Sequence, residues 1–563
     1  MHRTSLHTLS RAAALIAAFT APAAAQRATL PLKFDPRPTT AAITPADLMT
    51  RLYIFADDSM MGRQAGTVYH DKGTSYIARE LARIGVQPAG ENGGYFQQIP
   101  LVSRALANGT TVTVDGRAFA AGGDFLTRDN GPTARTMQNA AAIYGGVWGG
   151  GENTMLPADQ ASGKVVVITV PRGWQANRGA LTQRYLGAAG VAVVSLDSMP
   201  AEVRAALSEP AVTLQDEIDQ AQQQMPPVPA FFYTSQAMAA SFFGAPLASL
   251  KVGTTGKALS GAFNYTATPA PGARNVVGII PGSDPKLRGQ YVAIGAHSDH
   301  VGTGEAVDHD SLYAFYHVVR PEGADDGEKP AAAEDWPKVR AMLDSLRKTH
   351  AARQDSIFNG ADDDGSGSMG VLEVAEAFAS APVKPKRSIL LVWHVAEELG
   401  LFGSAYYTEH PTVPRDSIVA QLNVDMIGRG PKALAPGGGT GDLQIIGSRR
   451  LSTELGDIVD AEGKKLNPPL KYDYQYDANG HPGQYYCRSD HYMYARYGIP
   501  VAFLSTGGHP EYHEVTDEPE YIDYDGLARV SQLLYNIAER VANLDHRLVV
   551  DKPKPDPKGQ CVQ

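Results

Sequence analysis

Short apolar runs recur through the second half of the chain, and each has the length and content of a strand buried on both faces of a sheet. They occupy residues 291–295, 389–393, 419–424 and 499–504. Apolar residues at helical spacing lie between some of these runs, and a terminal helix is predicted for residues 524–544. This alternation predicts an α/β domain.

Side chains that can bind a metal or move protons follow the predicted strands. His297 comes after the first run, Glu397 and Glu398 after the second, and Asp425 after the third. In open α/β sheets the chemistry lies just beyond the carboxyl ends of the strands, so we expect these residues to meet. Two adjacent glutamates can take different tasks there, one binding a cation and the other handling protons.

Two more candidates complete the set. Asp363 lies in the acidic, glycine-containing run 359–367 before a predicted helix, and His513 lies near the end of the chain. Two imidazoles and three carboxylates suit zinc, but five ligands are too many for one tetrahedral ion. They suit two ions that share one carboxylate and lie roughly 3.5–4 Å apart. The candidate ligands are His297, Asp363, Glu398, Asp425 and His513.

Each candidate has a plainer interpretation when it is taken alone. A single histidine is more often a hydrogen-bonded core or surface residue, and an acidic run before a helix usually caps that helix. An isolated pair of glutamates is more often a solvated turn. The prediction of a metal centre therefore depends on the five residues as a set.

Composition and charge exclude some classes of protein. The chain has 563 residues, 43% of them hydrophobic and 20% charged, as in an ordinary globular protein with room for two or more domains. A formal net charge of −10 argues against a nucleic-acid-binding protein, which would carry a basic patch.

The first 25 residues have the pattern of an export signal. Arg3 and Arg11 give a basic start, residues 12–19 an apolar centre, and Ala23 to Ala25 a small-residue cleavage site. The alternative is a segment retained as a membrane anchor. No later stretch approaches the roughly 20 apolar residues that span a bilayer, so we expect a periplasmic or secreted protein without membrane contact after cleavage.

Residues 131–260 differ from their surroundings, because many short apolar runs there are separated by glycines. Gly163 and Lys164 lead into one predicted strand, 165–170, and the small residues 187–190 lead into another, 191–196. This pattern resembles a protease-associated domain, which implies a smaller, β-rich domain inserted into the first. None of its residues has the spacing of metal ligands.

A second insertion, residues 301–359, follows the first histidine motif. It contains one predicted amphipathic helix, marked by Val339, Met342, Leu343 and Leu346. Its charged residues are either a solvated face or part of a lid over the site.

The two cysteines, Cys487 and Cys561, leave their pairing open. A bridge between them is possible, but Cys561 lies in a Lys- and Pro-rich tail, 546–563, which we expect to be disordered. That context favours two unpaired cysteines.

Five motifs in order resemble the co-catalytic two-zinc exopeptidases typified by bacterial secreted aminopeptidases and related to glutamate carboxypeptidase. They read Ala-His-Ser-Asp, Gly-Ala-Asp-Asp-Asp-Gly-Ser-Gly, Ala-Glu-Glu-Leu-Gly-Leu-Phe-Gly-Ser, Asn-Val-Asp-Met-Ile-Gly and Tyr-His-Glu-Val-Thr-Asp. The resemblance implies a peptidase domain over 43–130 and 261–545, with a mixed, mostly parallel sheet flanked by helices. The 301–359 insertion departs from compact family members and leaves pocket shape and substrate size open.

The resemblance also implies a role for each residue. Asp363 would bridge two zinc ions, with His297 and Asp425 on one ion and Glu398 and His513 on the other. Glu397 would be the general base, and Tyr512 would polarise the substrate carbonyl. Asp299 would be the carboxylate that orients His297.

The expected function is that of an exported zinc aminopeptidase acting on peptides. The alternatives are a carboxypeptidase or dipeptidase of the same fold, or a binding protein with an inactive peptidase domain. The sequence contains neither G-x-S-x-G nor H-E-x-x-H, the signatures of other hydrolases. Side-chain preference, the oligomeric state and the use of the inserted domain cannot be read from it.

Overall fold

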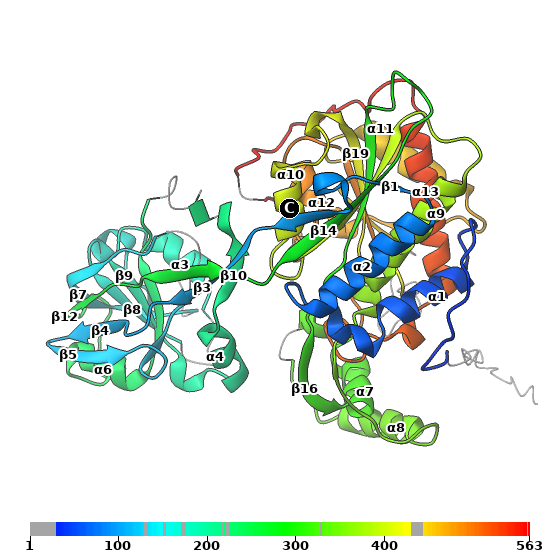
Figure 1. The fold of residues 1–563 in the computed structure, drawn as a ribbon. Coiled ribbons are helices and arrows are strands. Elements are labelled where there is room, and N and C mark those ends of the chain that lie inside the picture. The colour runs from blue at the N-terminus through cyan, green and yellow to red at the C-terminus, as the bar shows by residue number, and fades with distance from the viewer. Residues whose placement is uncertain are drawn as a thin grey trace, which may run out of the picture.

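A mixed β-sheet of nine strands forms the centre of the larger unit of the computed structural model (Figure 1). The structure describes residues 30–128, 133–149, 154–170, 176–216, 218–219, 226–326, 329–429, 443–559 and 561–563. The predicted export signal, 1–25, lies outside these residues. None of the helices in the described ranges combines the length and apolar character needed to cross a membrane.

The four central strands of this sheet are parallel, as the apolar runs predicted. In spatial order they are β18 (Ser388–His394), β15 (Tyr291–His297), β19 (Ile418–Val424) and β22 (Val501–Ser505). An antiparallel strand flanks them on each side. Next to β18 lies β14 (Ala273–Ile280), which also pairs with β1 (Gln87–Pro88) and β2 (Phe96–Ile99). Next to β22 lies β20 (Leu443–Ile446), and β21 (Tyr472–Asp473) pairs with β20. The predicted α/β class with a mixed sheet is confirmed.

Alternation along β18 shows why these strands are apolar throughout. Ile389, Leu391 and Trp393 pack into one core, and Leu390 and Val392 into the core on the opposite face. A strand with helices on both faces must bury every side chain. All seven residues of β18 are buried.

Helices cover both faces of the sheet (Figure 1). Those on the first face contribute to the larger core: α1 (Pro45–Phe55), α2 (Val68–Arg83), α9 (Gly367–Ser380), α11 (Thr453–Lys465) and α13 (Tyr524–Ala542). The opposite face is covered by α10 (Phe402–Glu409) and α12 (His491–Ala495). The terminal helix predicted for 524–544 is confirmed by α13.

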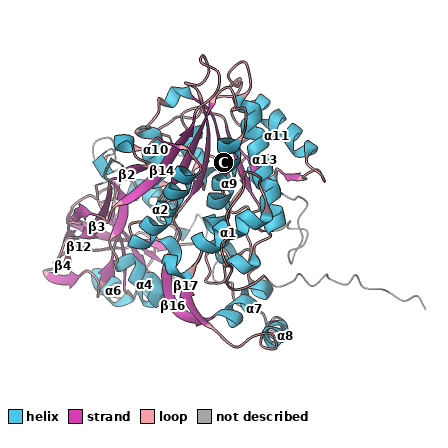
Figure 2. Ribbon diagram, turned by 45° about the vertical axis from the view of Figure 1, so that its right-hand side comes forward, coloured by secondary structure: helices cyan, strands magenta, loops and turns pink. Residues whose placement is uncertain are grey.

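A second unit lies beside the first and is built on an eight-stranded sheet (Figures 1 and 2). The chain reaches it through β3 (Leu101–Leu106) and leaves through β13 (Tyr265–Pro269). Strand β3 pairs with β13 on one side and with β10 (Ala211–Leu214) on the other. The strands of the eight-stranded sheet are β4 (Thr111–Val114), β5 (Arg117–Ala120), β6 (Phe125–Leu126), β7 (Met137–Val147), β8 (Val165–Thr169), β9 (Gly190–Val194), β11 (Ala230–Thr234) and β12 (Thr255–Gly261). The helices α3 (Arg178–Arg184), α4 (Ala201–Ser208) and α6 (Gln236–Phe243) belong to the same unit.

The start of this unit differs from the predicted boundary at residue 131. Strands β4, β5 and β6 precede that residue, yet they pair within the second sheet. Strand β4 pairs with β12, whose residues lie far along the chain, and no local pattern in 111–126 reveals that partner. The identification of the unit as a protease-associated domain stays a prediction.

The 301–359 insertion forms a small subdomain at the edge of the larger unit (Figure 2). Its base is the strand pair β16 (Thr303–Asp308) and β17 (Gln354–Ile357), and it carries α7 (His309–Val319) and α8 (Trp336–Leu346). The predicted amphipathic helix is confirmed by α8, whereas α7 was not predicted. Arg63 lies in the glycine-rich run 61–67 and holds the two ends of the insertion near each other. Its guanidinium donates to the carbonyls of Ser298 (3.3 Å), Asn359 (2.6 Å) and Gly360 (2.9 Å).

The expectation of a disordered tail with unpaired cysteines is wrong for the described residues. Cys487 and Cys561 form a disulfide across 74 residues. The side chain of Gln563 accepts from the N–H of Tyr486 (2.7 Å) and donates to the carbonyl of Tyr476 (3.1 Å). The partners of the tail lie on a distant segment, so its own composition could not reveal them.

Candidate metal centre and active site

The carboxyl ends of the parallel strands bring the predicted residues to one edge of the sheet. His297 ends β15, and Asp425 comes directly after β19. The loop after β18 carries Glu397 and Glu398, and the loop after β22 carries His513. Parallel strands place these ends side by side, which explains why residues far apart in sequence meet.

Asp363 lies at the centre of the cluster, with one carboxylate oxygen toward each histidine. Its Oδ1 is 3.0 Å from His297 Nε2, and its Oδ2 is 3.1 Å from His513 Nε2. Asp425 Oδ1 lies 3.5 Å from His297 Nε2, and Glu398 Oε2 lies 3.0 Å from His513 Nε2. The five residues thus form two groups that share Asp363.

These distances fit zinc. With bonds of about 2.0–2.2 Å, two ligand atoms on a tetrahedral zinc ion lie roughly 3.3 Å apart. The Nε2 atoms of His297 and His513 are buried and make no hydrogen bond of acceptable geometry within the described residues. Buried polar atoms without partners are rare, and here each of the two groups contains one. The donor set of both groups therefore suits zinc.

The neighbours of Asp363 tie the surrounding chain together. Asp364 accepts hydrogen bonds from the main-chain N–H groups of His297 and Met426, both at 3.1 Å, so it joins the ends of β15 and β19. Asp362 accepts from the N–H of Gly428 at 2.6 Å. The outer two aspartates thus hold the strand ends, and the middle one is left to face the histidines.

The neighbouring histidines favour the ionised form of the Asp363 and Glu398 carboxyl groups. Burial raises the pKa of Asp363, but the imidazoles of His297 and His513 beside its two oxygens outweigh burial and hold the pKa well below its usual range. The pKa of Glu398 is lowered in the same way, against burial and the charge of Asp363, by His300 and His513. A carboxylate must be deprotonated to bind zinc, so both are in the required form.

Glu397 borders the ligands without belonging to either group. It lies on the wall of the pocket beside Asp425, and its main-chain N–H donates to Asp299 Oδ1 at 3.3 Å. Burial raises the pKa of Glu397 well above its ordinary value, and the charges of Asp425 and Glu398 add to this against the effect of His297. A carboxyl group in such a position can hold and release a proton.

Asp299 reaches His297 through its main chain. The hydrogen-bond partner of His297 Nδ1 is the main-chain oxygen of Asp299, at 3.1 Å, and the nearer carboxylate oxygen is 3.9 Å away. That carboxylate instead accepts from the N–H of Glu397. Asp299 therefore connects the ring of His297 with the loop that carries the proposed base.

His300 is a residue that the sequence analysis missed. Its Nδ1 lies 2.7 Å from Glu398 Oε1 and 3.7 Å from Asp363 Oδ2, and its side chain is fully buried. It belongs to the same group of possible ligands as Asp363, Glu398 and His513. Gly360 leaves room for the ring, since a Cβ there would lie 2.5 Å from His300 Cδ2. The signal was available, because His300 comes three residues after His297 and directly follows the Ala-His-Ser-Asp motif.

Tyr512 lies beside the group that contains Glu398 and His513, and Arg488 holds its hydroxyl in place. Its ring stacks on that of His513 with centroids 4.1 Å apart. Arg488 Nη2 donates to Tyr512 Oη at 3.2 Å, and the guanidinium of Arg488 also pairs with Asp325 of the insertion at 3.0 Å. Burial raises the pKa of Tyr512, so its hydroxyl stays a hydrogen-bond donor.

A pocket of about 470 Å³ opens onto these residues. Its lining includes four carboxylates, those of Asp363, Glu397, Glu398 and Asp425. Apolar and aromatic side chains also line it, namely Leu401, Met426, Tyr485 and Phe503. A pocket lined by both carboxylates and apolar side chains suits a ligand that carries both a cation and an apolar side chain.

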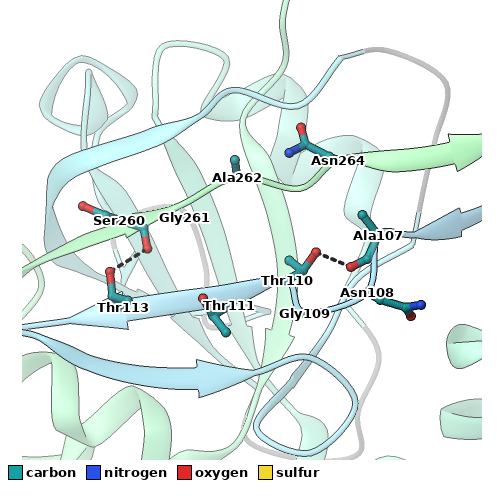
Figure 3. Close-up of a pocket in the computed structure, with 10 residues that line it drawn as sticks. All are labelled: Ala107, Asn108, Gly109, Thr110, Thr111, Thr113, Ser260, Gly261, Ala262 and Asn264. Carbon is teal, nitrogen blue, oxygen red and sulfur yellow. Dashed lines mark hydrogen bonds between the residues drawn. The ribbon is translucent and has the colours of Figure 1, made fainter.

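Another hollow, of about 440 Å³, lies on the second unit (Figure 3). Its ten lining residues include no titratable side chain. Two of the threonines there donate to main-chain carbonyls, Thr110 Oγ1 to that of Ala107 at 2.6 Å and Thr113 Oγ1 to that of Ser260 at 3.1 Å. This hollow offers neither an acid–base pair nor a set of metal ligands.

Comparison with known proteins finds a family model that matches part of the chain. Residues 336–538 match the model of Peptidase family M28. The leupeptin-inactivating enzyme 1 of Streptomyces exfoliatus is 46% identical over 97 residues, which are 17% of this chain and 22% of that protein. Leucine aminopeptidase 1 of Uncinocarpus reesii is 28% identical over 192 residues, 32% of this chain and 46% of that protein. The chain thus spans less than half the length of these two relatives.

Similar solved structures come from two bacteria. The aminopeptidase from Aneurinibacillus sp. strain AM-1 gives a TM-score of 0.48 at 16% identity, over 91% of this chain and 97% of that one. BSAP, a zinc aminopeptidase from Bacillus subtilis, gives 0.47 at 17% identity, over 89% and 96%.

Proposed function

We propose that the chain is an exported, zinc-dependent aminopeptidase that removes N-terminal residues from peptides, and the match of residues 336–538 to the model of Peptidase family M28 supports this. The observation that carries this proposal is the position of Asp363. Its two oxygens face two histidines, each accompanied by a further carboxylate, which is the arrangement of a two-metal hydrolase. Elemental analysis of the mature chain should give about two zinc ions, and one ion per active chain would contradict it.

The residues around the ligands supply the rest of the chemistry. Zinc, when bound by these residues, would supply Lewis-acid polarisation of the peptide carbonyl and of a water molecule. Glu397 takes the proton from the attacking water and delivers it to the leaving amine. The hydroxyl of Tyr512 donates a hydrogen bond to the oxyanion that develops on the carbonyl.

The distribution of charge supports action at the amino end. The carboxylates that line the pocket favour an ammonium group over a carboxylate in the ligand. A carboxypeptidase would direct arginines at the terminal carboxylate of its substrate. Arg429 has 12% of its side chain exposed and pairs with Asp517 at 2.7 Å. Arg488, the one arginine among the described residues that line the pocket, is paired with Asp325.

Export rests on two separate observations. The basic, apolar and small-residue pattern of residues 1–25 is typical of a signal peptide. The disulfide between Cys487 and Cys561 is the kind of bond that persists in an oxidising compartment.

A carboxypeptidase or dipeptidase is the second candidate, because Arg488 borders the pocket. Blocked versions of one short peptide separate the two. An aminopeptidase should cleave the C-amidated peptide and not the N-acetylated one, and the reverse pattern would move the protein to the second candidate. Loss of both activities with two zinc ions still bound would favour a binding protein.

A further inference from the structure

The insertion reaches the active site through a short 3-10 helix, Gly323–Asp326. The N–H of Ala324 donates to the carbonyl of Tyr512 at 3.2 Å. Gly323 has a φ of +60°, and a Cβ on it would lie 2.6 Å from the carbonyl oxygen of His509. Only glycine allows this approach, so the turn is fitted closely to the loop that carries Tyr512 and His513.

The same turn places a carboxylate against Arg488, the one arginine among the described residues that line the pocket. The two nitrogens of the Arg488 guanidinium lie 3.0 and 3.1 Å from the two oxygens of Asp325. Both side chains line the pocket and are partly exposed, Arg488 at 38% and Asp325 at 33%. An ion pair this exposed contributes little to folding stability. Its main effect is therefore on the charge of the pocket.

Arg488 lies where it could bind a carboxylate of the substrate, and its pairing with Asp325 opposes that binding. Arg488 Nη2 lies 3.2 Å from Tyr512 Oη, the hydroxyl proposed to bind the scissile carbonyl. One residue of peptide extends at most about 3.3–3.6 Å, so a carboxylate on the residue after the scissile bond comes within reach of this guanidinium. Arginine binds carboxylates in a two-bond fork, and Asp325 already occupies that fork.

We propose that Asp325 is a specificity-determining residue, which neutralises Arg488 and makes the site discriminate against substrates whose free carboxylate follows the scissile bond directly. The favoured substrates are then peptides of three or more residues and amidated dipeptides, and the disfavoured ones are free dipeptides. This inference rests on the proposed aminopeptidase function and adds the length and terminal charge of the substrate.

The test compares Leu-Gly with Leu-Gly-amide, using the full zinc-loaded mature chain. Asp325→Asn should raise kcat/KM for Leu-Gly relative to Leu-Gly-amide by about tenfold, because Arg488 becomes free to bind the carboxylate. The double variant Asp325→Asn/Arg488→Gln should return the ratio to that of the wild type. Arg488→Gln alone should lower both rates, through Tyr512, and leave the ratio within about twofold.

Two controls separate this effect from a general change of charge or fold. Asp326→Asn alters the same turn and lies outside the pocket lining, and Asp457→Asn removes a partner from Arg449, an arginine of the same 38% exposure on another surface. Neither should change the ratio. An unchanged ratio in Asp325→Asn, or a rise that persists in the double variant, would overturn the inference.

A binding measurement keeps the inference distinguishable from the proposed function. Calorimetry with the reduced-bond analogue of Leu-Gly and with its amide needs no turnover. The Asp325→Asn variant should bind the free acid about tenfold more tightly and the amide within about twofold of the wild type. A chain that cleaves neither dipeptide but shows this shift would contradict the function alone, whereas equal affinities in both proteins would contradict the role of Asp325.

Discussion

Asp517 Oδ2 accepts a hydrogen bond from the main-chain N–H of Asp363 at 3.1 Å. The same carboxylate accepts from the N–H of Asp362 at 2.9 Å and pairs with Arg429 at 2.7 Å. Asp517 closes the loop that carries His513, so this loop is bound directly to the turn that carries the shared ligand. The two halves of the proposed metal centre are thus held together before any ion arrives.

Replacing Asp517 by alanine should therefore damage both stability and metal binding. The change leaves two buried N–H groups without their acceptor and removes the nearest carboxylate from the guanidinium of Arg429, which is 12% exposed, a loss of about 3–5 kcal/mol. Denaturant unfolding of the metal-free chain should show it, and zinc titration should show weaker binding. Asp545→Asn, at an exposed position, is the control, and equal stability of both variants would contradict this account.

The adjacent glutamates should separate by phenotype. Glu397→Gln removes only the group that moves the proton, so it should lower kcat by about 10²–10⁴-fold and keep both metals. Glu398→Ala removes a ligand beside His513 and should weaken the binding of one zinc ion. Metal content and turnover measured on the same preparations distinguish the two. Equal loss of metal from both variants would contradict the assignment.

The sequence carried enough information for the central sheet and for the residues at its edge. Continuous apolar runs predict strands such as β15 and β18, and parallel strands bring their ends together, so His297 and Glu398 could be placed near each other. Contacts between distant segments gave no such local signal. The pairing of Asp325 with Arg488 joins two loops 163 residues apart, and nothing in the sequence near either residue indicates the other.

His300 should support the second metal group. Its hydrogen bond fixes the orientation of Glu398, and removal of such an outer partner typically weakens metal binding 10–100-fold. His300→Ala should therefore lower the affinity for one zinc ion, measured by competition with a chromogenic chelator, while the other stays bound. His317→Ala is a matched control, because His317 contacts Glu511 and no ligand. Loss of both ions from His300→Ala would contradict the placement.

The disulfide should stabilise the wall of the pocket as well as the tail. Cys487 lines the pocket, and its bond to Cys561 closes a long loop, for which removal typically costs about 2–4 kcal/mol. Cys561→Ser should lower the melting temperature, and reductant should lower that of the wild type and not that of the variant. A variant as stable as the wild type would show that the hydrogen bonds of Gln563 hold the tail alone.

Stability should fall as the pH rises from 7 to 9, and His509 should carry part of that fall. His509 is buried between Asp362 Oδ2, at 3.2 Å, and Glu511 Oε2, at 3.0 Å, with Arg429 nearby. Burial and Arg429 lower its pKa, but the two carboxylates outweigh them and raise it from 6.5 to about 9. The folded chain therefore binds the proton more tightly than the unfolded chain. The resulting stabilisation is complete below about pH 6.5 and is lost as the pH rises through 9.

A neutral side chain at this position isolates the contribution, because other buried groups titrate in the same range. His509→Gln keeps a hydrogen-bond donor toward Asp362 and cannot gain a charge. Its stability should fall less steeply between pH 7 and 9, by on the order of 1 kcal/mol per pH unit relative to the wild type. Zinc-saturated protein is used for denaturant unfolding at each pH, so that His513 does not titrate. Parallel curves for the two proteins would show that His509 is neutral in the folded chain, and that Asp362 and Glu511 do not hold a proton on it.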